Sequence, residues 1–157
     1  MFDKDVETFK NIANRINNLN AKIKLIALLE KARYEYQQNN YSECENSCRQ
    51  ILKTNPKNSI ALRGLGCVMQ AKNNYKKALE YYNLALEFSE NKEIEYTLIG
   101  MIYYLEENLD EAIKHFNFAI EINDNYDPAY EGRNQSMLEN HLKIADLQDQ
   151  LIRQKIF

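Results

Sequence analysis

Glycine and proline are scarce in this chain of 157 residues, which contains four glycines and two prolines. All-β sandwiches and barrels use many such residues in their turns, so this class of fold is disfavoured. Long helices joined by short connections fit the composition better, because helix interiors exclude both residue types. We therefore expect an all-α protein.

Signals for export and for membrane insertion are also missing. The opening residues Met1–Glu7 are acidic and lack the basic and apolar regions of a secretory signal. No stretch approaches the roughly 18 apolar residues that a membrane-spanning helix needs. The three cysteines are an odd number, and without an export signal they predict reduced thiols and a cytoplasmic location.

No charge of one sign dominates the chain. Lysine and arginine total 20 and aspartate and glutamate 23, which gives a formal net charge of −3. Such a chain has no overall positive field to attract phosphates, so we expect no nucleic-acid partner. Apolar residues make up 45%, a globular value, so the chain is expected to fold.

What the chain does contain is an internal repeat. The segment Lys77–Phe88 aligns without a gap with Glu111–Ile122, at an offset of 34 residues. Four of the twelve positions are identical. Upstream, residues 62–66 and 96–100 align at the same offset, and each of these segments ends in glycine. A further shift by the same offset reaches 28–52, where the match is weaker.

This pattern resembles the tetratricopeptide repeat, a helix-turn-helix unit of about 34 residues with small side chains at its eighth, twentieth and twenty-seventh positions. The resemblance covers three units: 25–58, 59–92 and 93–126. It implies an α-α superhelix, or solenoid, in which each unit buries its apolar face against its neighbours. Gly66 and Gly100 take the eighth position, where the two helices of a unit cross closely.

A helical extension is predicted before the repeats, at residues 1–24. It has one apolar stripe, formed by Phe2, Val6, Phe9, Ala13 and Ile16. The run Asn17–Asn20 is expected to end this helix, with Asn20 capping the first helix of unit one. The extension is either a cap packed on unit one or a helix for self-association through heptad spacing.

A capping helix is predicted after the repeats, at residues 127–157, with Asp127 as N-cap and Pro128 at its first position. Its apolar residues continue to Ile152, further than a cap alone requires. Its second half is therefore expected to lie in the chain's own groove, against a second copy, or on a partner. A break at Glu139–His141, giving a hairpin, is the alternative.

No catalytic or metal-binding motif accompanies the repeat. Cys44 and Cys48 have a spacing that could present two thiolates to a metal, but they fall on core positions of the repeat. We therefore interpret them as buried thiols. His115 and His141 stand outside any known catalytic motif, so we expect neither enzyme activity nor a cofactor or metal.

The resemblance implies a binding groove lined by the first helix of each unit, through its second, fifth, ninth and twelfth residues. These positions hold Ile26, Leu29, Arg33, Tyr36, Ile60, Arg63, Cys67, Gln70, Ile94, Thr97, Met101 and Tyr104. The recurring isoleucine forms either a ladder along the groove or part of the packing between helices. Tyrosine and arginine are favoured at binding surfaces, so a peptide or helix with apolar side chains and an acidic group would suit this groove.

One subclass of the family binds the C-terminal carboxylate of heat-shock chaperones through a clamp of lysine, asparagine and arginine. Here Leu29, Arg33 and Gly64 occupy clamp positions, so that ligand is not expected. The expected function is a non-catalytic scaffold or adaptor. The layout is also similar to that of class II secretion chaperones, which hold apolar segments of secreted translocators. A regulatory domain of a larger assembly is the remaining alternative.

Overall fold

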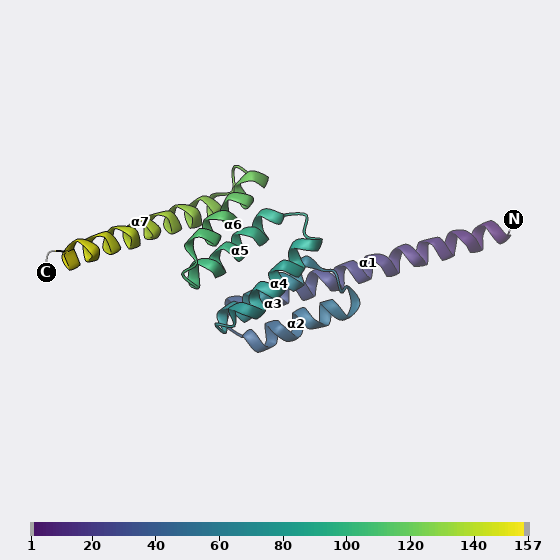
Figure 1. Cartoon of the computed structure of the whole chain (residues 1–157). Coiled ribbons are helices and arrows are strands. Elements are labelled where there is room, and N and C mark those ends of the chain that lie inside the picture. The colour runs from purple at the N-terminus through teal and green to yellow at the C-terminus, as the bar shows by residue number, and fades with distance from the viewer. Residues whose placement is uncertain (1, 156–157) are drawn as a thin grey trace.

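The computed structural model describes residues 2–155, and all regular secondary structure in that range is helical. Seven helices follow one another: α1 (Phe2–Gln37), α2 (Tyr41–Thr54), α3 (Ser59–Ala71), α4 (Tyr75–Phe88), α5 (Lys92–Leu105), α6 (Leu109–Ile122) and α7 (Asp127–Lys155). Each helix packs against the next, and the stack runs from one end of the molecule to the other (Figure 1). The predicted all-α solenoid is confirmed. None of the described helices combines the length and apolar character needed to cross a bilayer.

The period of the repeat is visible in the helix boundaries. The second helix of each unit begins at Tyr41, Tyr75 or Leu109, and each is 14 residues long. The turn inside each unit contains one residue with a positive φ of 56–59°, at Asn39, Asn73 and Glu107. Asparagine tolerates this left-handed conformation better than most residues, which explains its use at two of the three turns.

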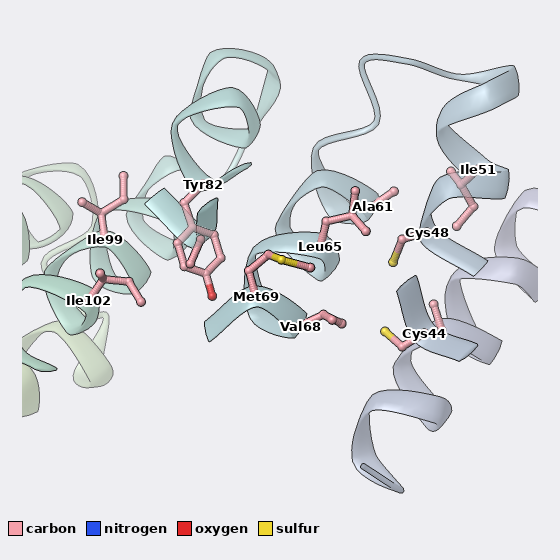
Figure 2. Close-up of a cluster of buried hydrophobic side chains, with 12 residues drawn as sticks. Cys44, Cys48, Ile51, Ala61, Leu65, Val68, Met69, Tyr82, Ile99 and Ile102 are labelled. Atoms are coloured by element: carbon pink, nitrogen blue, oxygen red, sulfur yellow. The ribbon is translucent and has the colours of Figure 1, made fainter. Parts of the chain in front are cut away.

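The core lies both within the units and between neighbouring units. Figure 2 shows Cys44 and Cys48 on α2 with their sulfur atoms turned toward α3, where Leu65 and Val68 lie. Both cysteine side chains are 2% exposed, so their interpretation as buried core residues is confirmed. The larger side chain of Tyr82, on α4, is completely buried in the same core.

The small residues at the eighth position allow aromatic rings to pack onto the first helices. A Cβ atom at Gly66 would lie 2.3 Å from the ring of Tyr82, and one at Gly100 would lie 2.9 Å from the ring of Phe116. The predicted close packing at both glycines is thus confirmed. The same Phe116 ring also faces Gly132 of α7, where a Cβ atom would come within 2.4 Å.

We expect Gly100→Leu to lower the free energy of unfolding by about 1–3 kcal/mol, the usual cost of overpacking a core. The ring of Phe116 is 1% exposed, and even a Cβ atom at Gly100 would lie 2.9 Å from it. Thermal unfolding measures the effect, and Ala21→Leu at an exposed position of α1 is the control. An unchanged melting temperature for Gly100→Leu would contradict the packing described here.

The N-terminal extension differs from the prediction in two ways. α1 is one helix of 36 residues, so Asn17–Asn20 lie inside it and Asn20 caps nothing. Asparagine costs a helix interior only about 0.7 kcal/mol or less relative to alanine, and α1 contains neither glycine nor proline to end it. Every residue from Lys10 to Lys24 is exposed, so the predicted cap packed on unit one is wrong. The side chains of Phe2, Val6 and Phe9, part of the predicted stripe, lie outside those that the structure describes.

The C-terminal helix α7 is continuous over 29 residues, so the alternative of a hairpin at Glu139–His141 is wrong. Its first half packs on α5 and α6 and buries Ala129 and Ser136. Its second half projects from the solenoid, opposite to the end from which α1 projects (Figure 1). Leu147 and Leu151 are 58% and 57% exposed, so the predicted return of this segment into the chain's own groove is wrong. An unbroken helix cannot turn back toward the groove.

Candidate peptide-binding groove

An apolar pocket of about 620 Å³ opens between α1, α2 and α3. Its volume is within the range of pockets that hold small ligands or side chains of a bound peptide. It brings together seven of the predicted groove residues: Ile26, Leu29, Arg33, Tyr36, Ile60, Arg63 and Cys67. Gly64, Cys44 and Cys48 complete much of the wall, and Ile26 and Ile60 are 60% and 53% exposed. Two isoleucines of the predicted ladder therefore face the pocket instead of filling the space between helices.

Gln70 and Ile94 lie outside this pocket. The amide oxygen of Gln70 accepts a hydrogen bond of 2.8 Å from the hydroxyl of Tyr82. Gln70 therefore accepts the hydrogen bond of a buried tyrosine in its own unit. Ile94, at the start of α5, is half-buried.

The remaining predicted residues are on α5, near α7. Thr97 is only 4% exposed, and its hydroxyl donates to the Glu93 carbonyl oxygen at 2.8 Å, so it does not face an open surface. The hydroxyl of Tyr104 accepts a hydrogen bond of 3.0 Å from the side-chain amide of Gln135. Met101 is 41% exposed. The groove at unit three is thus partly occupied by contacts within the chain, whereas the pocket at units one and two is open.

The two arginines of the pocket have different environments. Arg33 is exposed, and its guanidinium donates to the exposed carboxylate of Glu30 at 2.6 Å. Arg63 is 21% exposed, and its Nε donates at 2.9 Å to Glu95 of α5, whose side chain is completely buried. The Oε2 atom of Glu95 has no hydrogen-bond partner among the described residues. Arg63 therefore neutralises a buried carboxylate, and it is not the free positive group that the sequence suggested.

Sequence reasoning missed Glu95, the partner of Arg63, as well as Glu30, Ala32 and Gln37 of the pocket lining. Glu95 occupies the third position of unit three, where units one and two have Ala27 and Ala61. A charged residue at a position that is otherwise alanine was a visible signal, because a carboxylate can be buried there only with a partner. Its partner, Arg63, is 32 residues away in sequence, and only the fold brings the two together.

Three cysteines border the pocket, and all three are free. Burial raises the pKa of the Cys48 thiol to about 12, and burial also raises the pKa of Cys44 and of Cys67. A raised pKa means that the protonated thiol persists at neutral pH, so these groups are weak nucleophiles and weak metal ligands. Within residues 2–155, no cluster of histidine, cysteine, aspartate or glutamate is arranged to hold a metal ion.

We expect iodoacetamide to label Cys44 and Cys48 slowly at pH 7.5 in the folded protein and rapidly in denaturant. The thiolate is the reactive form, and burial suppresses both its population and its access. Mass spectrometry of the labelled peptides over time measures each site. Rapid labelling of either residue in the native protein would show that the wall of the pocket opens.

Comparison with known proteins agrees with the repeat and the fold. Two models of the tetratricopeptide-repeat family match the chain, one at residues 64–92 and one at residues 94–126. The second and third units are therefore tetratricopeptide repeats. No curated protein matches the sequence significantly.

Solved structures of tetratricopeptide-repeat domains have the same fold. The first such domain of Spaghetti (RPAP3), bound to the HSP90 peptide SRMEEVD, is 18% identical, with a TM-score of 0.67, and the match covers 74% of this chain and 93% of that one. The Sgt2 domain from Aspergillus fumigatus is 18% identical, with a TM-score of 0.68 and coverage of 78% and 82%. A Thermobaculum terrenum O-GlcNAc transferase mutant is 22% identical, with a TM-score of 0.67, over 72% of this chain. The match spans only 22% of that enzyme.

Proposed function

We propose that this protein is a non-catalytic adaptor that binds a segment of a partner protein in the pocket between α1 and α3. The observation that carries the proposal is the open, largely apolar pocket of about 620 Å³ on the face formed by these helices. Binding of a peptide or helix in such a groove relies on pockets for alternate apolar side chains. A similar domain of known structure holds a peptide of HSP90, which supports a peptide as the type of ligand.

The lining of the pocket indicates the chemistry of the ligand. Leu29, Arg33 and Gly64 border it, where the chaperone-binding subclass has clamp residues for a carboxylate. Leu29 and Gly64 offer no charge, and Arg33 already has Glu30 as a partner. We therefore expect an internal segment with apolar anchor side chains as the ligand, instead of a C-terminal carboxylate.

A display library of random peptides, selected on the full chain, tests the proposal. The matched variants are Ile60→Asp in the pocket and Leu84→Asp on α4, both at exposed positions. We expect the selected peptides to bind the wild type and Leu84→Asp equally and to bind Ile60→Asp at least about tenfold more weakly, because the new charge must be desolvated by an apolar ligand. Peptides that bind all three proteins equally, or a failure to select any, would overturn the proposal.

The proposal includes a cytoplasmic location, where reduced thiols persist, and no nucleic-acid partner. A chaperone-like protein that holds apolar translocator segments would use the same pocket, and it stays the alternative. A regulatory domain of a larger assembly is also an alternative. Self-association through α1 or α7 remains a prediction, and sedimentation of the full chain measures it.

A further inference from the structure

The projecting part of α1 has an exposed apolar seam. We call it the arm seam, and it consists of Ile12, Ile16, Leu19, Ile23 and Ile26, each 47–60% exposed. Successive members are four, three, four and three residues apart. This is the spacing of the a and d positions in a coiled coil, and it places all five side chains in one line along the helix.

The arm seam continues into the pocket. Ile26 is its last member and also lines the pocket. Beyond Ile26 the same register reaches Glu30 and Arg33, which bond to each other at the surface. Beyond Ile26 the a and d positions are therefore no longer apolar. The apolar surface continues instead into the pocket, beside Leu29 and Ile60.

The length of the arm seam indicates a helical ligand. From Ile12 to Ile26 it extends about 21 Å at about 1.5 Å per residue. The arm presents a single helix with no sheet edge, so an extended peptide lying on it would find no backbone partners. A second helix satisfies its own backbone and can insert apolar side chains at heptad spacing between those of the arm.

The charges beside the arm seam indicate an acidic ligand. Between residues 10 and 26 the charged residues are Lys10, Arg15, Lys22 and Lys24, and none is acidic. In the heptad register, Arg15 and Lys22 occupy the g positions that flank the seam, and the opposite flank has neutral residues. A helix with glutamate or aspartate at its own flanking positions would form ion pairs with both Arg15 and Lys22.

A second copy of the same arm lacks this complementarity. In an antiparallel pair, Arg15 would face Lys22 of the other copy, twice by symmetry. In a parallel pair, Arg15 and Lys22 would lie beside Asn20 and Ala27 of the other copy, without an opposite charge. The charges therefore favour a helix other than the arm of a second copy.

We propose that the arm seam and the pocket form one extended site for an amphipathic helix of a partner protein, with acidic residues flanking its apolar stripe. This inference rests on the proposed function, because it extends the same groove. The arm seam indicates that the ligand is helical and acidic, which the pocket alone does not indicate.

Two synthetic helices of about three heptads test the inference. Both have leucine at a and d, and one has glutamate and the other lysine at every e and g position. Each is labelled and titrated with the full chain in a fluorescence anisotropy assay. We expect the glutamate helix to bind at least about tenfold more tightly than the lysine helix, with a preference that weakens as salt is added.

Charge reversal on the arm supplies the matched variants. We expect Arg15→Glu combined with Lys22→Glu to reverse the preference, so that the lysine helix binds more tightly. Lys10→Glu combined with Lys24→Glu changes the net charge equally, but these residues occupy b positions away from the seam, so the original preference should persist. Equal effects of both pairs would mean that net charge alone acts, and would overturn the inference.

Two further outcomes separate this inference from its alternatives. If the full chain sediments as a dimer that Ile16→Asp dissociates, and neither helix binds, a second copy covers the arm seam and the inference is wrong. Another outcome is that the peptides selected from the display library bind Ile60→Asp more weakly than the wild type, but bind Ile16→Asp as tightly. If the glutamate helix also binds Ile16→Asp as tightly as the wild type, the arm takes no part in binding. The proposed function would then stand and only this extension would fail.

Discussion

Replacing Arg63 with methionine is expected to lower the free energy of unfolding by about 3–5 kcal/mol, the usual effect of breaking a buried ion pair from one side. The carboxylate of Glu95 is fully buried, and its Oε1 atom accepts a hydrogen bond of 2.9 Å from Arg63 Nε. Removal of Arg63 leaves a charge in the core with no partner. Urea unfolding followed by circular dichroism measures the loss.

Two comparisons identify the cause of this loss. Arg33→Met removes an arginine whose partner Glu30 is exposed, and such pairs contribute only about 1 kcal/mol or less. Combining Arg63→Met with Glu95→Leu removes both charges, and we expect it to recover most of the lost stability, since apolar replacement of a buried pair is often neutral. A double variant as unstable as Arg63→Met alone would show that the buried charge is not responsible.

Removing the ring of Phe116 is the second change with a large expected effect. We expect Phe116→Ala to cost about 3–5 kcal/mol, the range for truncating a buried aromatic residue. The ring is 1% exposed and packs on the backbone at both Gly100 of α5 and Gly132 of α7. Its loss leaves a cavity where three helices meet, and the glycines on either side have no side chains to fill it.

Phe118→Ala, on the same helix α6, is the control. The Phe118 side chain is 36% exposed, so its truncation creates no closed cavity, and we expect a clearly smaller loss. Thermal unfolding of both variants and of the wild type measures the difference. Equal melting temperatures for the two variants would contradict the role of the ring between Gly100 and Gly132.

The pair Arg63–Glu95 also connects stability with binding. Its two members belong to α3 and α5, the first helices of neighbouring units, and Arg63 borders the pocket. A variant at Arg63 therefore changes both the fold and the wall of the groove. Ile60 is the better position for testing binding, because its side chain is 53% exposed.

The repeat was readable from the sequence because a solenoid gives equivalent positions equivalent surroundings. Gly66 and Gly100 are one period apart, and each packs against an aromatic ring of the second helix in its own unit, Tyr82 or Phe116. Once the period is found, each unit predicts the packing of the next. Seven of the eight positions predicted in units one and two line the pocket, whereas in unit three Tyr104 bonds to Gln135 of α7.

The sequence by itself determined the class of fold, the period of the repeat and the burial of Cys44 and Cys48. All of these depend on short-range patterns that repeat along the chain. The tertiary structure decided that Arg63 forms an ion pair with Glu95, because this pairing depends on how α3 lies relative to α5. It also decided that Asn17–Asn20 continue a helix, since weak local preferences for a break yield to an uninterrupted run of helix-forming residues on both sides. That continuity brings the arm seam and the pocket into one line, which no local pattern could have shown.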